Sequence, residues 1–234
     1  MFLLALIVLG ISCESAPPTE TELYIYLDFT EGQDYGDRFT EDIEQYSELL
    51  NLTEEGSSNF GKVKIYPLYD VTSARSKTVK LKAGKGEFEK NVHLRKKDIE
   101  KFQTKLLQKL EKMNAEYTGK ELDNSHIFEP MCKGIRKLNK SDADRKVILM
   151  YSDMLENSDI ANFHSKKGSS KKWLEQFDAA CDPEDVSDLE IFVVDPVDKK
   201  NDDKITKAAD FWATYFAEKG IDEEAFHYDT GIDL

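Results

Sequence analysis

Apolar residues along this chain follow two spacings, one typical of strands and one typical of helices. Short, almost unbroken apolar runs predict buried strands at 23–27, 147–151 and 189–194. Two alternating stretches, 62–68 and 77–81, predict an antiparallel pair at one edge of a sheet. Apolar residues three or four positions apart predict helices at 37–52, 98–117, around 131–138, at 171–180 and at 204–219. This order predicts an α/β fold with a mostly parallel, doubly wound sheet, an antiparallel edge strand and helices on both faces.

The N-terminal residues form a separate apolar segment. Residues 1–12 are too few to span a bilayer core of about 30 Å, and their composition is that of a signal peptide. Cys13 follows directly, an arrangement that resembles a bacterial lipoprotein cleavage site and would make Cys13 the lipid-modified first residue of the mature protein. Gly10 stands where leucine is most usual in such sites. An ordinary secretory signal and an uncleaved anchor are the alternatives.

The lipoprotein interpretation divides the rest of the chain into two parts. Residues 13–21 would be the lipidated cysteine and a flexible tether, and residues 22–234 a single domain. We therefore expect a membrane-anchored lipoprotein of the bacterial cell envelope that faces the periplasm or the exterior.

The charge and the remaining cysteines add two expectations. The chain carries 46 acidic against 32 basic residues, a net charge of −14, which argues against nucleic acid as a partner because phosphates need a concentrated basic surface. One basic stretch, 82–97, is expected to be a solvated surface loop. Cys132 and Cys181 are expected to be buried free thiols, since nothing in the sequence fixes the distance between them.

Polar side chains stand directly behind two of the predicted strands. Asp28 and Thr30 follow the run 23–27, and Ser152 and Asp153 follow the run 147–151. Open α/β sheets bind their ligands at the carboxyl ends of the strands. Carboxylate and hydroxyl oxygens suit a hard cation such as Mg²⁺, so the two strand ends together are a candidate metal site.

The order of these residues resembles a von Willebrand factor type A (vWA) domain over about 22–219. That family's metal site takes an Asp-x-Ser/Thr-x-Ser loop after the first strand, a hydroxyl before a middle helix and a late aspartate. Asp28 and Thr30 match the loop, Ser125 matches the hydroxyl, and Asp153 matches the aspartate. The resemblance implies that these four residues hold Mg²⁺ or another divalent cation, and that an acidic side chain of a protein partner completes its coordination shell.

One position departs from the family pattern. Gly32 replaces the second serine of the loop, so the site has one hydroxyl ligand fewer, and a vWA-like scaffold that has lost its metal is an alternative interpretation. In that alternative the basic stretch 82–97 is a candidate contact surface. Three acidic residues are expected to form a partner-binding rim around the metal site, namely Glu31, Asp34 and Glu156.

An enzyme is the second alternative. Asp28-Phe29-Thr30 also resembles the first motif of haloacid-dehalogenase-type phosphatases, in which the aspartate is the nucleophile of an Mg²⁺-dependent reaction. Threonine cannot supply the proton that this mechanism needs two residues after the nucleophile. The later motifs of that family would be supplied by Ser152, by Lys166 or Lys171, and by Asp195 with Asp198.

Overall fold

The computed structural model describes residues 17–54, 57–68, 76–84, 92–120, 124–165, 169–184, 186–195 and 202–232. The predicted signal peptide at 1–12 and the lipidation site Cys13 lie outside these residues, as do Lys166 and Asp198 of the phosphatase alternative.

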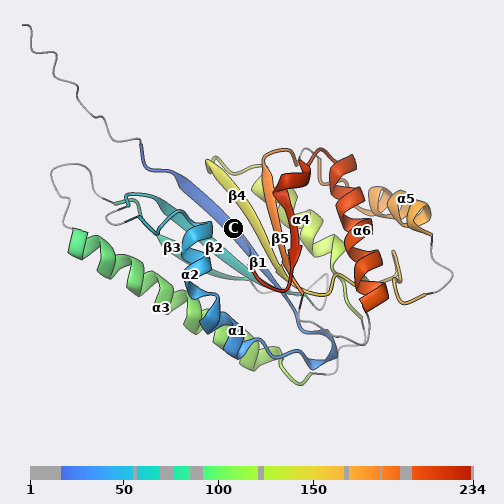
Figure 1. Cartoon of the computed structure of the whole chain (residues 1–234), viewed down its shortest axis with the longest axis horizontal. Coiled ribbons are helices and arrows are strands. Elements are labelled where there is room, and N and C mark those ends of the chain that lie inside the picture. The colour runs from blue at the N-terminus through green and yellow to red at the C-terminus, as the bar shows by residue number, and fades with distance from the viewer. Residues whose placement is uncertain are drawn as a thin grey trace, which may run out of the picture.

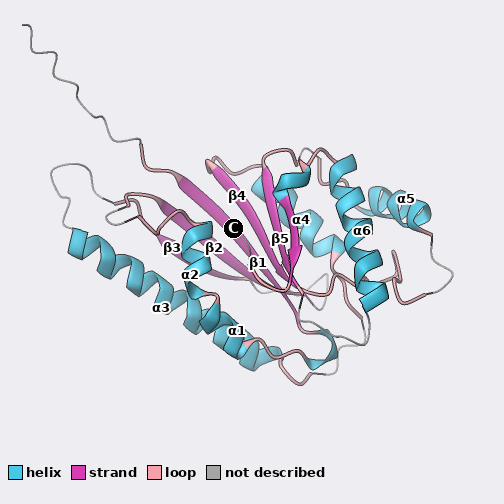
Figure 2. Ribbon diagram, viewed as in Figure 1, coloured by secondary structure: helices cyan, strands magenta, loops and turns pink. Residues whose placement is uncertain are grey.

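The described residues form one sheet of six strands, in the order β3-β2-β1-β4-β5-β6. β3 pairs with β2 in antiparallel orientation, and the other neighbouring pairs are parallel. The predicted mostly parallel sheet with an antiparallel edge strand is therefore confirmed (Figures 1 and 2). The strands are β1 (Glu20–Asp28), β2 (Phe60–Leu68), β3 (Lys77–Leu81), β4 (Arg145–Tyr151), β5 (Leu189–Val194) and β6 (Phe226–Asp229).

Helices cover both faces of the sheet, as Figure 1 shows. Successive side chains of a strand point to opposite faces, so Leu23 and Ile25 of β1 join the core under α1 to α3, whereas Tyr24 and Tyr26 join the core under α4 to α6. No helix among the described residues is long and apolar enough to cross a membrane. The helices are α1 (Gly36–Glu41), α2 (Ile43–Leu49), α3 (Val92–Tyr117), α4 (Phe128–Leu138), α5 (Ser170–Ala180) and α6 (Asp202–Glu218).

The structure corrects two of the predicted boundaries and adds one strand. β1 begins at Glu20, so Glu20 and Thr21 belong to the sheet and not to the tether. α3 begins at Val92, which places the last third of the expected basic loop in a helix. Arg95 of this helix is buried, and its guanidinium donates hydrogen bonds to the backbone oxygens of Ser57 (2.7 Å) and Lys82 (2.9 Å). β6 was not predicted.

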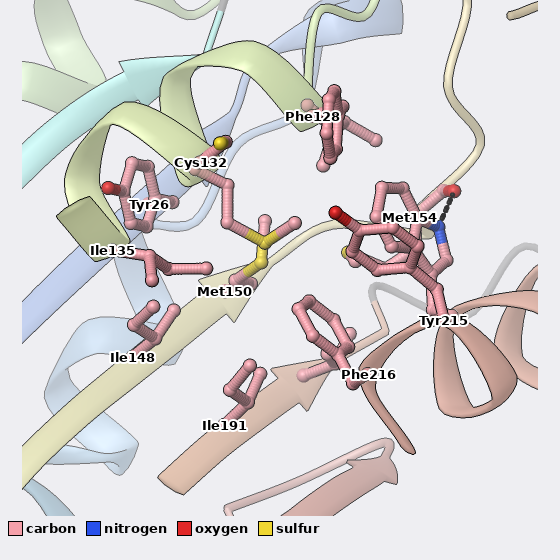
Figure 3. Packing of buried hydrophobic residues seen from close by; sticks show 14 of the residues in the cluster. Tyr26, Phe128, Cys132, Ile135, Ile148, Met150, Met154, Ile191, Tyr215 and Phe216 are labelled. Carbon is pink, nitrogen blue, oxygen red and sulfur yellow. Dashed lines mark hydrogen bonds between the residues drawn. The ribbon is translucent and has the colours of Figure 1, made fainter. Parts of the chain in front are cut away.

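Cys132 and Cys181 form a disulfide, so the expectation of two free thiols is wrong. Cys132 lies in α4 and Cys181 directly follows α5, 49 positions later, with 6.3 Å between their Cα atoms. The bond links two helices on the same face of the sheet, and both cysteines belong to the apolar core there; Figure 3 shows Cys132 beside Ile135 and Tyr26.

A buried carboxylate lies near the amino-terminal ends of the parallel strands, opposite to the carboxyl ends where Asp28 lies. Glu22 of β1 is 1% exposed and forms ion pairs with Lys62 (2.7 Å) and Lys64 (3.1 Å) of β2. Ser141 also donates a hydrogen bond to it, over 2.6 Å. Burial alone would raise the pKa of Glu22, but the hydrogen bonds from Lys62, Ser141 and Lys64 outweigh burial and lower the pKa from 4.5 to about 2.

Replacing Glu22 by glutamine is expected to remove one part of the acid sensitivity of folding. The pKa is lowered in the folded state, so the ionised carboxylate stabilises the fold above pH 4.5, and this stabilisation disappears as the pH falls toward 2. Because solvent screens the partly exposed lysines, we expect Glu22→Gln to lower the free energy of unfolding by about 2 kcal/mol at pH 7. The deficit should vanish near pH 2.

Urea unfolding at pH 7, 4 and 2.5 measures this difference. Glu48→Gln, which removes an exposed carboxylate from α2, is the matched control and should keep the pH dependence of the wild type. A Glu22→Gln deficit that stayed constant from pH 7 to pH 2.5 would show that the ion pairs do not carry the effect.

Candidate functional site

Asp28, the last residue of β1, lies at the centre of a group of hydroxyls. Its Oδ1 accepts hydrogen bonds from the backbone N–H (3.0 Å) and the hydroxyl (2.7 Å) of Thr30. Its Oδ2 accepts from the hydroxyls of Ser125 and Ser152, each over 2.8 Å. Asp28, Ser125 and Ser152 are all buried. The structure thus brings together three of the four predicted metal residues and adds Ser152.

The three hydroxyls come from separate parts of the chain. Thr30 begins a short 3-10 helix, Thr30–Gly32, directly after β1. Ser125 precedes α4 and is held by a backbone bridge to Asn157. Ser152 follows β4, the neighbour of β1 in the sheet, and Leu27 pairs with Tyr151, so Asp28 and Ser152 are the next residues along two adjacent parallel strands. The register of the sheet therefore determines this contact.

Asp153, the fourth predicted metal residue, has a different partner. Its Oδ1 accepts a hydrogen bond from the backbone N–H of Leu155 (2.9 Å), and its backbone oxygen accepts from the hydroxyl of Tyr228 (3.0 Å). Its carboxylate still lies near the site: after burial, the charges of Asp28, Asp153 and Asp195 are what raise the pKa of the Tyr35 hydroxyl. That hydroxyl donates a hydrogen bond to the backbone oxygen of Asp28.

Glu156, one of the expected rim residues, is 1% exposed and is therefore not on a rim. Its Oε2 accepts hydrogen bonds from the backbone N–H groups of Ile127 (2.9 Å) and Phe128 (2.8 Å), at the start of α4. A carboxylate is favourable there because the first N–H groups of a helix have no partner within the helix. Burial raises the pKa of Glu156 to about 7, helped by the negative charge of Asp28 and opposed by hydrogen bonds from Ser158 and these N–H groups.

The other two rim residues have different outcomes. Asp34 is exposed, and its Oδ1 accepts hydrogen bonds from the side chain of Asn114 (2.6 Å) and the backbone N–H of Gly36 (3.0 Å), which lower its pKa. It is thus available to solvent and fixed in position. The side chain of Glu31 lies outside the part of the chain that the structure describes.

The donor set fits a small hard cation. A hydroxyl has one donor and two acceptor positions, so a hydroxyl that donates to Asp28 still offers its oxygen to a metal. The residues that would hold Mg²⁺ are Thr30, Ser125 and Ser152, with Asp28 orienting them. Within the described ranges no three His, Cys, Asp or Glu residues gather to hold a metal ion, so this set depends on hydroxyls and water and not on a carboxylate cluster.

Gly32, which breaks the family pattern, has a backbone conformation that favours glycine. Its φ is +73°, a region that residues with a side chain rarely adopt. A Cβ built there would lie 3.9 Å from Gly119, and no atom of Asp28 would be within 4 Å of it. In this loop conformation a side chain at position 32 would thus begin beside Gly119 and not at the hydroxyl group around Asp28.

The structure supplies one of the contacts that the phosphatase alternative requires. Ser152, its second motif, does reach Asp28. Lys171, one of its two candidate lysines, lies exposed on α5, and the hydroxyl of Thr30 donates a hydrogen bond to Asp28.

Comparisons with known proteins support the fold. Neither a family model nor a curated protein matches the sequence. The minor pilin PilB of Streptococcus sanguinis, solved as a point mutant, superposes with a TM-score of 0.54 at 8% identity, over 94% of this chain and 59% of the pilin chain. This chain thus spans about three fifths of the length of that pilin.

Two further solved structures superpose less closely. An aerotolerance-related membrane protein of Bacteroides fragilis gives a TM-score of 0.42 at 11% identity, over 91% of this chain and 92% of the other. The human COPII-coat protein Sec24c also gives 0.42 at 11% identity, over 93% of this chain and 30% of the other. At such identities similarity concerns the fold alone, which by its sheet order and layers is a vWA/Rossmann-like α/β fold.

Proposed function

We propose that this protein is a membrane-tethered, exported binding module whose vWA-like domain holds an Mg²⁺-type cation at the carboxyl ends of its strands and binds a protein partner there. The observation that carries the proposal is the convergence of three hydroxyls, from three separate segments, on the single carboxylate of Asp28. Buried hydroxyls and a buried carboxylate are costly unless they serve each other or a ligand. Here the hydroxyls satisfy the carboxylate, and because a hydroxyl that donates keeps acceptor positions on its oxygen, the set can also serve a ligand.

Each residue of the set has a defined task in this proposal. Asp28 accepts hydrogen bonds from the hydroxyls of Thr30, Ser125 and Ser152, which turns their oxygen lone pairs away from the carboxylate. Asp153 would contribute through water. A cation bound by neutral oxygens and water supplies an open position for a strong anionic ligand, so an acidic side chain of the partner would give a directional, charge-assisted contact. Asp34, exposed and fixed by Asn114, would contact the partner at the rim.

The proposed location rests on the disulfide as well as on the N-terminal sequence. Disulfides persist in oxidising compartments and are rare in the cytosol of mesophiles. The Cys132–Cys181 bond therefore favours export to the periplasm or the cell exterior, in agreement with a signal peptide at 1–12 and a lipid anchor at Cys13.

Thermal unfolding with and without Mg²⁺ tests the proposal. At ten times the dissociation constant, a ligand that binds only the folded state contributes about 1.4 kcal/mol, which raises the Tm of a domain of this size by roughly 3–6 °C. We expect this shift in the wild type and its loss in Asp28→Ala and Thr30→Val. Comparing each variant with itself, with and without Mg²⁺, separates cation binding from any general loss of stability.

Asp144→Asn is the matched control for this experiment. Asp144 is an exposed carboxylate at the opposite edge of the sheet, where it accepts a hydrogen bond from the backbone N–H of Glu20 (2.8 Å), and the variant should keep the full shift. No shift in the wild type at 10 mM Mg²⁺, Mn²⁺ or Ca²⁺ would contradict the proposal.

The absence of a shift would favour a vWA-like scaffold that has lost its metal. One observation already supports this alternative: donors of the chain itself fill all four acceptor positions of the Asp28 carboxylate. Turnover of a phosphomonoester that Asp28→Asn abolishes would instead favour the phosphatase.

A further inference from the structure

We propose that Ser152 supplies the hydroxyl ligand that Gly32 cannot supply. The inference rests on the proposed function, because it concerns the same cation, and it assigns a residue that the family pattern does not include. It explains how the folded site can have three hydroxyls, from Thr30, Ser125 and Ser152, although the serine that the family pattern has at position 32 is absent.

The hydrogen bonds of Ser152 leave its oxygen suited to this task. Its Oγ donates to Asp28 Oδ2 over 2.8 Å and accepts from the backbone N–H of Met154 over 2.9 Å. A hydroxyl oxygen has two acceptor positions, and the described residues occupy one of those of Ser152 Oγ, so the other is open to a cation. Ser125 donates to the same oxygen of Asp28 over the same distance, so the two serine hydroxyls are equivalent toward that carboxylate oxygen.

The turn after β4 holds Ser152 in place. Met154 has a φ of +57°, an unfavourable value for a residue with a side chain, and is nevertheless fully buried. Its backbone N–H donates a hydrogen bond to Ser152 Oγ, and its backbone oxygen accepts one from the indole N–H of Trp212 (2.8 Å). The second bond is the dashed line beside Met154 in Figure 3. A strained turn fixed at both ends orients Ser152 before any ligand arrives, which lowers the cost of binding.

Position 32 itself offers no hydroxyl, because it is a glycine. A serine there would need the left-handed backbone of Gly32, and its Cβ would begin beside Gly119. Ser152 instead reaches Asp28 through the register of β1 with β4, which the whole length of two central strands enforces.

Calorimetric titration with Mn²⁺ tests the assignment. Ser152→Ala is expected to lower the affinity at least about tenfold, the range seen when groups that support a metal site are removed. Ser152→Thr, which keeps the hydroxyl, should retain most of the affinity. The control is Ser141→Ala, because Ser141 also donates its hydroxyl to a buried carboxylate, Glu22, but at the other edge of the sheet; its affinity should equal that of the wild type.

The outcomes separate this inference from the proposed function. If the wild type binds Mn²⁺ and Ser152→Ala binds it equally well, the assignment of Ser152 is overturned and the metal site stands. If the wild type does not bind Mn²⁺, both are overturned. If Ser152→Ala does not fold, a crystal structure of the wild type with Mn²⁺ decides the question: the inference requires Ser152 Oγ among the atoms that coordinate the ion and fails if Oγ is not among them.

Discussion

Replacing Gly134 by alanine is expected to lower the free energy of unfolding by at least about 2–3 kcal/mol, because the added methyl group has no space. Gly134 lies in the middle of α4, where the helix packs onto β1. A Cβ there would overlap the hydroxyl oxygen of Tyr26, lie 3.0 Å from its Cζ and 3.4 Å from Tyr24 Cδ2. The higher helix propensity of alanine, worth about 1 kcal/mol, does not offset this overlap.

The ring of Tyr26 cannot move aside easily. Tyr26 is fully buried in the central strand of the sheet, stacks on Tyr66 with 5.1 Å between ring centroids, and donates a hydrogen bond to the backbone oxygen of Pro130 (3.4 Å). In Figure 3 it lies under α4 beside Ile135. We therefore expect α4 itself to shift, which would carry Ser125 and Cys132 with it.

Thermal unfolding should show the loss as a fall in Tm of roughly 4–12 °C. Tyr26→Phe removes the overlapping oxygen, so the double variant should be more stable than Gly134→Ala alone, and the coupling energy from the double-mutant cycle should be at least about 1 kcal/mol. Gly36→Ala is the control, since a Cβ at the start of α1 meets only side-chain atoms at 3.3 Å and beyond. An unchanged Tm in Gly134→Ala, or no coupling to Tyr26, would refute the packing argument.

The fold could be predicted from the sequence wherever burial imposes a period. β5 and β3 have the predicted boundaries, Leu189–Val194 and Lys77–Leu81, because each is a short apolar or alternating run between polar residues. β6 escaped prediction because Phe226–Asp229 mixes aromatic and polar residues at an edge of the sheet, where neither face is fully buried. Its presence is a consequence of pairing with β5, which no local pattern records.

The candidate site was partly predictable for the same reason. Asp28, Thr30 and Ser125 carry a recognisable spacing, and the structure brings them together. The bond from Ser152 to Asp28 depends on the register between two strands more than 115 positions apart in the chain, so the sequence indicates only that both residues end strands. Glu156 was misplaced because a glutamate in a loop normally faces water, and nothing local shows that the N–H groups of α4 would bury it.

Removing the disulfide is expected to destabilise the protein by about 2–4 kcal/mol. The bond closes a loop of 49 positions between α4 and the end of α5, and such a constraint restricts the unfolded chain, with an entropic contribution of about 4 kcal/mol in the simplest treatment. The variant Cys132→Ala with Cys181→Ala loses this constraint. It also loses two buried sulfur atoms from a core that contains Phe128 and Phe177.

Urea unfolding with and without dithiothreitol separates these two contributions. Reduction should destabilise the wild type by most of the expected amount and leave the double alanine variant unchanged. Cys13→Ser is the control for the third cysteine, and it should respond to the reductant as the wild type does. A wild type that is equally stable in both conditions would mean that the bond constrains nothing beyond what the core already holds. A response in the double alanine variant would mean that the reductant acts elsewhere than on this disulfide, so the fall in stability of the wild type could not be assigned to the bond.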